Sequence, residues 1–278
     1  MDLRSHQGLC RDQWRLQELS LPAALISPEL ASVRRFEAAG FRAWPAAHVH
    51  YDGTWLLRVT AGHPAKRLNS VNPLDPNDVD RFDERIAAAG DMFAQRDLPL
   101  TFRLSPLSGE AMNAHFNKAG WSVFSESLVM HRSLDDRLIA PALDQIPMKD
   151  VARFVGAAIR AKGASNILRP ALTGILSAIE PETGLFALER GDEALATAIC
   201  VQDGELAGLF EVATAPAERG KGYARRIVLS ALKWARLRGA RTAWLQVEAD
   251  NDHARSLYES LGFAELYRYH YRQPPGTT

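Results

Sequence analysis

The alternation of apolar and polar residues along the chain predicts a repeating series of helices and strands. Apolar residues at helical spacing, closed by glycines, indicate amphipathic helices at residues 29–39, 78–96, 110–119, 149–161, 170–179, 222–238 and 253–261. Asp-Gly pairs between apolar runs indicate hairpins across Asp52–Gly53 and Asp203–Gly204. Further strands are expected at residues 67–71, 100–104, 121–133, 185–189, 241–247 and 263–271. Residues 1–30 are weakly patterned and are expected to form an arm or a short helix.

The second half of the chain repeats the order of elements in the first. At an offset of 142 residues, segments 71–77, 95–99, 100–104 and 115–121 lie on segments 213–219, 237–241, 242–246 and 257–263. Helix, strand and turn signals match in all four segments without a gap, although few residues are identical. A charged segment with a proline, residues 134–146, has the composition of a linker. The pattern therefore predicts a duplicated α/β domain.

Composition narrows the class of protein. The chain has 278 residues, of which 46% are hydrophobic and 24% charged, and this is typical of a globular protein with a substantial core. Its 33 basic and 33 acidic residues leave no overall positive field for nucleic acid. Cys10 and Cys200 lie far apart and form no zinc motif, and no apolar segment is long enough for a signal peptide or a membrane span. We therefore expect a cytoplasmic protein with no membrane or nucleic-acid partner and no metal.

A glycine-rich segment, residues 212–226, carries the clearest chemical signal. A strand ends there, a loop with Gly220 and Gly222 follows, and a helix begins at about Gly222. The first N–H groups of a helix have no intrahelical partner and favour an anion, and glycine lets a phosphate approach the backbone. Residues 214–241 contain eight basic residues and one acid. The segment is interpreted as a pyrophosphate cradle, and the alternative is a glycine-rich turn before a solvated basic helix.

The residues around this loop form a longer motif. The loop fits the pattern R-x-x-G-x-A at Arg219, Gly222 and Ala224. It is followed, in order, by a buried strand, by Asn251, and by the sequence Tyr-x-x-x-Gly-Phe that begins at Tyr258. Over residues 205–272 this constellation resembles the GNAT (Gcn5-related N-acetyltransferase) superfamily. The resemblance implies tandem GNAT-like domains, each with a mixed central sheet flanked by helices. Residues 1–140 are expected to form a degenerate domain without the cofactor motif, and residues 141–278 the acetyltransferase domain.

The resemblance also implies a cofactor site between two splayed strands. Family members bind acetyl-CoA there, as a co-substrate. The positions that match cofactor contacts are Val212 and Thr214 for the pantetheine amides, Arg219, Gly220, Lys221, Gly222, Tyr223, Ala224 and Arg225 for the pyrophosphate, and Asn251. Tyr258 matches the general acid that protonates the departing thiolate.

The expected reaction is direct transfer of an acetyl group to a small-molecule or peptide amine. A phenol, with a pKa of about 10, is suited to protonate a thiolate, although Tyr258 also fits an ordinary core position. Glu211 is the first candidate for the general base and Glu248 the second; the alternative for Glu211 is a solvent-facing strand carboxylate. Gln246 stands where some family members have a catalytic glutamate, and an amide cannot act as a base.

The first half departs from the motif at its key positions. Under the 142-residue offset, Asn77, Asp80 and Phe82 stand in place of Arg219, Gly222 and Ala224, and Phe116 stands in place of Tyr258. Carboxylates at a helix start repel a pyrophosphate, and Asp78 is better interpreted as a helix N-cap or first-turn acid. This half is therefore expected to keep the fold, to lack acetyl-CoA binding, and to cover the acceptor pocket or brace the sheet.

Other interpretations stay open. The alternative function is a non-catalytic acyl-CoA-binding or regulatory module, and a homodimer is possible. His48, His50 and His63 lie near Asp52 but lack the spacing of a metal site. Tyr267, Tyr269 and Tyr271 alternate on the last strand, where they can pack in the core, line the acceptor side or form a dimer interface.

Overall fold

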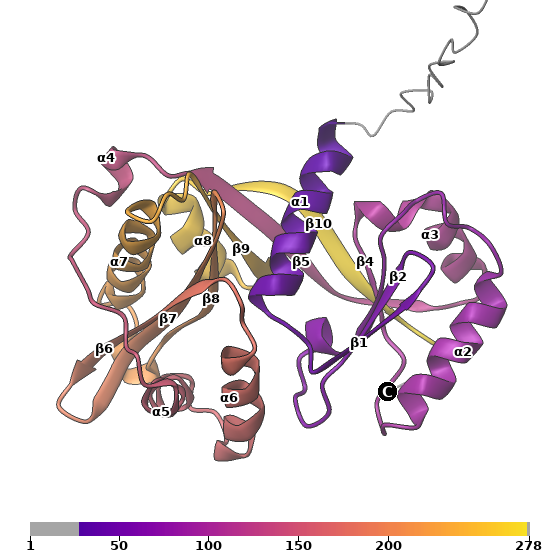
Figure 1. Ribbon diagram of the computed structural model, residues 1–278, viewed down its shortest axis with the longest axis horizontal. Helices are drawn as coiled ribbons and strands as arrows, with labels where there is room; N and C mark the ends of the chain where they lie inside the picture. Colours follow the sequence, from indigo (N-terminus) through magenta and orange to yellow (C-terminus); the bar gives the residue numbers. More distant parts are fainter. Residues whose placement is uncertain (1–27, 277–278) are drawn as a thin grey trace, which may run out of the picture.

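The computed structural model describes residues 28–276 as a mixed α/β structure, a ten-stranded mixed sheet flanked by helices (Figure 1). This confirms the predicted fold class. The arm expected in residues 1–30 lies, up to residue 27, outside the described residues, as does Cys10. The helices are α1 (Pro28–Ala43), α2 (Phe82–Ala94), α3 (Gly109–Lys118), α4 (Asp136–Ile139), α5 (Val151–Lys162), α6 (Arg169–Ser177), α7 (Tyr223–Arg236) and α8 (Asp252–Ser260). The strands are β1 (His48–Asp52), β2 (Trp55–Val59), β3 (Ser70–Pro73), β4 (Phe102–Leu104), β5 (Ser122–Ser133), β6 (Glu182–Arg190), β7 (Glu193–Asp203), β8 (Leu206–Thr214), β9 (Thr242–Glu248) and β10 (Ala264–Gln273).

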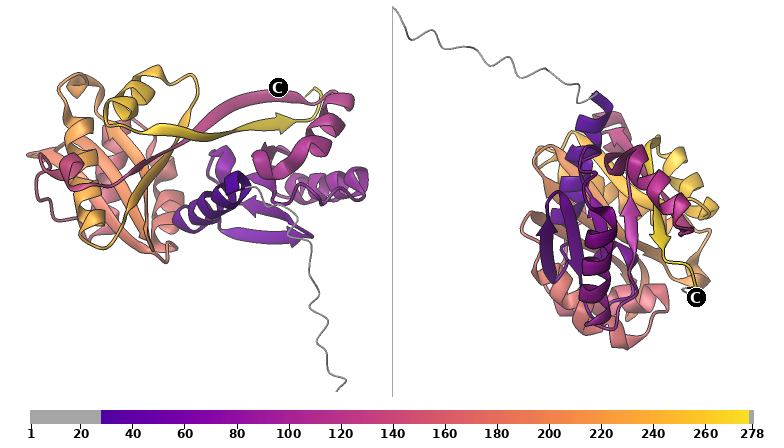
Figure 2. Two further views of the ribbon diagram at one scale, coloured as in Figure 1. Left: turned by 90° about the horizontal axis from the view of Figure 1, so that it is seen from above. Right: turned by 90° about the vertical axis from the view of Figure 1, so that its right-hand side faces the viewer.

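The two halves of the chain exchange their last strands. The strand order is β1-β2-β3-β4-β10-β5-β9-β8-β7-β6, so that β10 pairs with β4 of the first half and β5 pairs with β9 of the second. β5 and β10 also pair with each other, antiparallel, and run side by side from one lobe to the other (Figure 2). The 142-residue offset places Ser122, the first residue of β5, on Ala264, the first residue of β10. The division at residue 140 stays a prediction.

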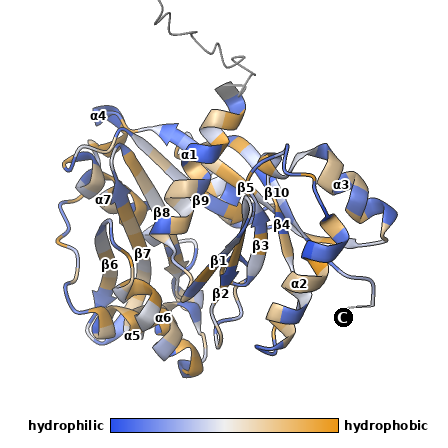
Figure 3. Cartoon of the chain, turned by 45° about the vertical axis from the view of Figure 1, so that its right-hand side comes forward, coloured by the Kyte–Doolittle hydropathy of each residue, from blue (hydrophilic) through white to orange (hydrophobic). Residues whose placement is uncertain are grey.

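Three large hydrophobic cores pack against this sheet, and a smaller cluster of alanines lies between α5 and β7. One core packs α7 and α8 against β8 and β9, at residues such as Leu209 and Leu245. A second packs α1, α5 and α6 against the sheet around Phe210 and Trp244. A third packs α2 and α3 onto Trp55, Phe102 and their neighbours in the first half. Hydrophobic residues are frequent on strands of the second half such as β7, whereas the helices alternate between hydrophobic and hydrophilic residues (Figure 3). Helices therefore cover both faces of the second half of the sheet, as the continuous apolar strand at residues 241–247 predicts.

A buried ion pair joins α1 to the middle of the sheet. Arg103 of β4 donates two hydrogen bonds to the carboxylate of Glu37, and both side chains are almost inaccessible to solvent. The hydroxyl of Tyr267 donates to the same carboxylate at 2.7 Å, and the Arg103 guanidinium lies 3.6 Å from the ring centroid of Tyr269. Burial, together with the nearby Glu37 charge, raises the pKa of Tyr267 well above its ordinary value. Tyr267 is therefore a core residue of the junction between the two halves.

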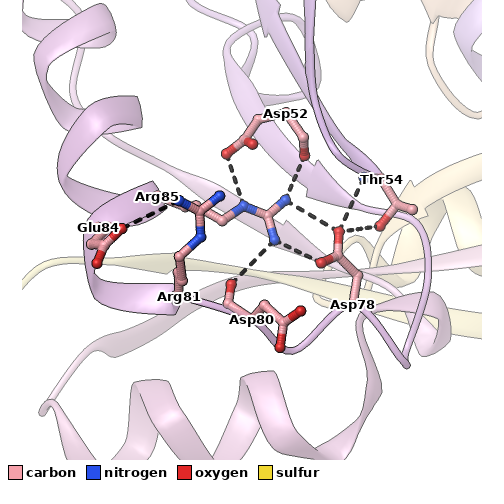
Figure 4. A network of polar contacts seen from close by, with 7 residues as sticks. All are labelled: Asp52, Thr54, Asp78, Asp80, Arg81, Glu84 and Arg85. Carbon is pink, nitrogen blue, oxygen red and sulfur yellow. Dashed lines mark hydrogen bonds and ion pairs between the residues drawn. The ribbon is translucent and has the colours of Figure 1, made fainter.

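A second polar network lies beside the start of α2 (Figure 4). The Arg85 guanidinium donates to Asp52 at 2.8 Å and to Asp78 at 2.7 Å, and it lies 3.9 Å from the ring centroid of Trp55. The N–H and hydroxyl of Thr54 also donate to Asp78. The interpretation of Asp78 as an N-cap is wrong, because the N-cap of α2 is Arg81 and Asp78 lies in the turn before it. Burial alone would raise the pKa of Asp78, but these hydrogen bonds lower it to about 2.

Removing one member of the Glu37–Arg103 pair should destabilise the fold strongly. Glu37→Ala leaves the Arg103 guanidinium buried without its carboxylate, and we expect a loss of about 3–5 kcal/mol in the free energy of unfolding, measured by urea denaturation. Arg35→Ala, on the same helix, removes an exposed ion pair with Glu205 and should cost less than about 1 kcal/mol. Equal effects of the two changes would contradict the role given to the buried pair.

Asp78 should contribute stability that depends on pH. Its folded pKa lies below the ordinary value of 3.8, so its contribution is present above that value and is lost as pH falls toward 2. We expect Asp78→Asn to lower the free energy of unfolding by about 2 kcal/mol at pH 7 and by about half as much at pH 3. Urea denaturation at the two pH values measures this. A difference that stays constant with pH would rule out the ionised carboxylate as its source.

Candidate functional site

The strands β8 and β9 separate at the centre of the second half. They pair in parallel from Leu206 and Thr242 to Leu209 and Leu245, and within the described residues no pairing between them continues beyond this point. On the other side of β8, the register with β7 shifts at a β-bulge, where Glu211 has a φ of +51°. A left-handed conformation at a non-glycine residue costs about 1–3 kcal/mol and is held by its surroundings. The last residues of β8 therefore border an opening in the sheet.

The glycine loop ends directly at the start of α7. Gly222 is the N-cap of this helix with a φ of +81°, and Gly220 has a φ of +77°. Both values lie in the left-handed region that favours glycine. The N–H groups of the first turn have no intrahelical partner, and no atom within 4 Å would meet a Cβ at either glycine. The loop thus presents backbone donors and open space to an anion.

Ion pairs reduce the positive charge expected around this loop. Five of its eight basic residues pair with carboxylates: Lys221 with Glu218, Lys233 with Asp144, Arg236 with Asp136, Arg238 with Glu182, and Arg241 with Glu205. Arg219, Arg225 and Arg226 have no ion pair within residues 28–276; Arg225 donates to the hydroxyl of Ser260 at 3.4 Å. The free positive charge is therefore confined to the loop and the first turn of α7.

Two adjoining cavities open where β8 and β9 separate. The loop cavity, of about 520 Å³, is lined by Ala161, Lys162, Val212, Ala213, Thr214, Arg219, Ala224, Asn251, His253, Ala254, Leu257 and Tyr258. The junction cavity, of about 430 Å³, is lined by Pro64, Ala65, Lys66, Arg67, Ser127, Lys162, Leu209, Phe210, Glu211, Val212, Gln246, Val247, Glu248, Asn251, Ala254, Tyr258, Tyr269 and Tyr271. Five residues line both cavities: Lys162, Val212, Asn251, Ala254 and Tyr258.

Tyr258 lies at the boundary between the cavities. It belongs to α8, is buried, and packs edge-on against Phe263 with 5.9 Å between the ring centroids. Burial raises the pKa of Tyr258 to about 12, so the phenol keeps its proton at neutral pH. Its hydroxyl has no hydrogen-bond partner among the described residues. Tyr258 is thus a core residue, which is the alternative that its sequence position allows. Its side chain also lines both cavities, and its hydroxyl is a donor without a partner among these residues.

Asn251 has a structural role besides the cofactor contact that the resemblance implies. It is the N-cap of α8, and its side-chain oxygen accepts a hydrogen bond from the N–H of Ala254 at 3.1 Å. This bond holds the first turn of α8. Because Asn251 also lines both cavities, the residue can position α8 and contact a bound molecule.

Glu211 is an enclosed carboxylate. Its side chain is 11% exposed, so the alternative of a solvent-facing strand carboxylate is wrong. Lys162 of α5 donates a short hydrogen bond to one oxygen, and Arg67 lies 3.7 Å from the other. Glu248 is 57% exposed, with Lys66 at 3.6 Å.

The other polar side chains of the junction cavity come from both halves of the chain. Gln246 accepts a hydrogen bond from the hydroxyl of Tyr269 at 3.1 Å. Tyr269 and Tyr271 of β10 both line this cavity. Of the interpretations given for the alternating tyrosines, packing in the core and lining a cavity therefore both apply to these two. The first half contributes Lys66, Arg67 and Ser127 to the lining. No sequence motif marks these three residues or Lys162, so sequence reasoning misses them. Only the fold brings them together.

The equivalent positions of the first half are built differently. Val71 pairs with Phe102 and its N–H donates to Thr101 at 2.8 Å, whereas the equivalent residue in the second half, Ala213, lies beyond the point where the strands separate. Asp78 takes the position of Gly220, and its carboxylate is already bound by Arg85. Before α2 the Asp78 carboxylate thus provides the negative charge that a bound pyrophosphate would provide before α7.

Two further features of residues 28–276 bear on function. They contain no group of three or more His, Cys, Asp or Glu side chains placed to hold a metal ion. None of their helices combines the length and the apolar character needed to cross a membrane.

Comparison with known proteins agrees with this geometry. Residues 30–272 match the family described as probable histone acetyltransferase Rv0428c C-terminal. The uncharacterized N-acetyltransferase YobR of Bacillus subtilis is 27% identical over 251 residues, covering 86% of this chain and 98% of that protein.

Two solved structures share the fold. A GCN5-related N-acetyltransferase from Kribbella flavida has a TM-score of 0.62 at 16% identity, covering 91% of this chain and 98% of that one. A tandem GNAT protein from the clavulanic acid biosynthesis pathway has a TM-score of 0.57 at 12% identity, covering 85% and 86%. This chain therefore has a tandem GNAT fold and belongs to the GNAT superfamily of N-acetyltransferases, through the family described as probable histone acetyltransferase Rv0428c C-terminal.

Proposed function

We propose that the chain transfers an acetyl group from acetyl-CoA directly to an amine. The observation that carries this proposal is the position of Tyr258, a protonated phenol without a hydrogen-bond partner among the described residues, on the wall that the two cavities share. One cavity reaches Arg219 and Ala224, on either side of the two loop glycines, and the loop suits a pyrophosphate. The other extends to the first half of the chain and is free for the acceptor.

The residues of the loop cavity fit acetyl-CoA. The backbone of residues 220–225 and the unpaired Arg219 would hold the pyrophosphate. The edge of β8 from Val212 to Thr214, left free by the separation of the strands, would pair with the pantetheine amides. When bound, acetyl-CoA supplies a thioester whose acetyl group an amine can attack. The N–H of Val212, next to the bulge, would donate to the carbonyl oxygen as negative charge develops there.

Tyr258 and Glu211 divide the proton transfers in this proposal. Tyr258 donates its phenolic proton to the departing sulfur, for which a group protonated at neutral pH is required. Glu211 receives the proton of the amine, directly or through water, and Lys162 holds its carboxylate in the junction cavity through a hydrogen bond. Glu248 is the second candidate for the base, although its greater exposure places it nearer to solvent.

The two halves have different roles in this proposal. The second half, residues 141–278, binds acetyl-CoA and carries the reaction. The first half, residues 1–140, does not bind it, because Val71 is paired with Phe102 at the equivalent position and the Asp78 carboxylate stands before α2 in place of Gly220. This half covers the acceptor side of the cavity through Lys66 and Arg67.

A carboxylate in the glycine loop should abolish acetyl-CoA binding. Gly222→Asp places a side chain at a φ of +81° and a negative charge where the pyrophosphate binds, so we expect a loss of more than about a hundredfold in affinity by calorimetry. Gly191→Asp is the matched control, since Gly191 also has a positive φ and open space around it but lies in the β6–β7 turn. Normal binding by the Gly222 variant would show that the cradle is misplaced.

Loss of the Tyr258 hydroxyl should slow turnover without weakening acetyl-CoA binding. Tyr258→Phe keeps the ring in the core and removes only the acid, and we expect kcat to fall by about a hundredfold or more. Tyr51→Phe, at an exposed position on β1, should leave kcat unchanged. Unchanged turnover in Tyr258→Phe would remove this residue as the acid. Binding of acetyl-CoA without turnover of any amine by the wild-type protein would favour the non-catalytic module.

A further inference from the structure

The junction cavity carries an excess of positive charge. Three cationic side chains line it, Lys66, Arg67 and Lys162, against the two carboxylates of Glu211 and Glu248. The excess of one positive charge lies on the side of the first half, away from the glycine loop. A ligand that neutralises it would carry a single negative charge.

Lys162 and Arg67 are not equivalent partners of Glu211. Lys162 donates a hydrogen bond to one carboxylate oxygen, whereas the nearest Arg67 nitrogen is 3.7 Å from the other, beyond hydrogen-bond distance. Lys162 thus neutralises Glu211 at close range. The Arg67 guanidinium has no hydrogen-bond acceptor among the described residues.

Stacking fixes the Arg67 guanidinium in place without using its donors. It lies 4.9 Å from the ring centroid of Trp44 and 5.9 Å from that of Phe210, and the side chain is 26% exposed. The backbone oxygen of Arg67 also accepts a hydrogen bond from Arg58 at 2.7 Å, which anchors the segment. A planar fork of N–H donors held against aromatic rings, with no acceptor, is suited to bind a carboxylate through two hydrogen bonds.

Lys66 lines the same cavity as the Arg67 guanidinium. Its ammonium group donates to the hydroxyl of Ser125 at 2.6 Å and lies 3.6 Å from Glu248. The rings of Phe124 and Tyr271 lie 5.8 and 5.6 Å from it. Lys66 therefore adds positive potential next to Arg67 while keeping its own partners.

We propose that the acceptor is an amine that also carries a carboxylate, and that Arg67 binds this carboxylate. The proposal rests on the proposed transferase function. Once its amine has lost a proton, such an acceptor carries one negative charge, which matches the excess of one positive charge better than a phosphate, with about −1.5 to −2. The amine end then lies toward Glu211 and Tyr258, and the anionic end lies against the first half. The half without a cofactor site thus selects the acceptor.

Two matched pools of acceptors test this. One pool contains free amino acids and the other contains the same amino acids as carboxamides, so the unknown side-chain preference affects both alike. The pools are offered to the full chain with acetyl-CoA, and acetylated products are measured by mass spectrometry. We expect the acids to be acetylated with a kcat/KM about tenfold to a hundredfold higher, the value of a charge-assisted pair of hydrogen bonds.

Variants locate the effect on Arg67. Arg67→Gln should lower kcat/KM for the acids by about tenfold or more and change that for the amides by less than about threefold. Arg96→Gln, at an exposed arginine of the turn after α2, should change neither. Ligand-observed NMR with the N-acetylated pools and CoA gives a readout without catalysis, in which binding of the N-acetyl acids should depend on Arg67.

The outcomes separate this proposal from the function on which it rests. Equal acetylation of acids and amides, or a loss in Arg67→Gln that is the same for both pools, overturns the carboxylate site and leaves the transferase intact. If acetyl-CoA binds but neither pool nor a pool of neutral amines is acetylated, the transferase function itself fails. If only neutral amines are acetylated, the transferase stands and the carboxylate site is wrong.

Discussion

The exchange of the last strands is the constraint on which the rest of the structure depends. β5 leaves the first half to pair with β9, and β10 leaves the second half to pair with β4. Each half therefore lacks an inner strand of its sheet until the other half supplies it. The buried pair of Glu37 and Arg103, with Tyr267 of β10, lies at this crossing and joins α1 to it. Because of the exchange, the first half cannot be a loosely attached neighbour of the second.

The site follows from this constraint and from two local devices. The bulge at Glu211 and the end of the β8–β9 pairing open the sheet, and the glycine loop places the start of α7 beside the opening. The exchange then brings Tyr269 of β10, Ser127 of β5 and the Arg67 segment to the far side of the same opening. The loop cavity is built mainly by residues near in the sequence, and the junction cavity by contacts between the halves.

This difference explains how much of the molecule the sequence predicts. Hydrophobic periodicity predicts the helices and strands because each depends on residues near in the chain, and the loop motif at Gly222 is local in the same sense. The charge around α7 is overestimated because several of its partners, such as Asp144 for Lys233 and Asp136 for Arg236, come from a distant segment, residues 136–144. Asp78 is misassigned because α2 begins only at Phe82 and because Thr54, 24 residues earlier in the chain, binds its carboxylate. The strand exchange leaves no trace in periodicity, since either strand would fit either position.

We expect acetyl-CoA to bind at the opening in the second half and not at the equivalent place in the first half, where the Asp78 carboxylate stands in place of Gly220. Hydrogen–deuterium exchange of the full chain with and without CoA is the direct test. Backbone amides should be protected in residues 212–226 and at the start of α8, with no change around the start of α2. Protection around residues 75–85, or none in the glycine loop at saturating CoA, would contradict this expectation.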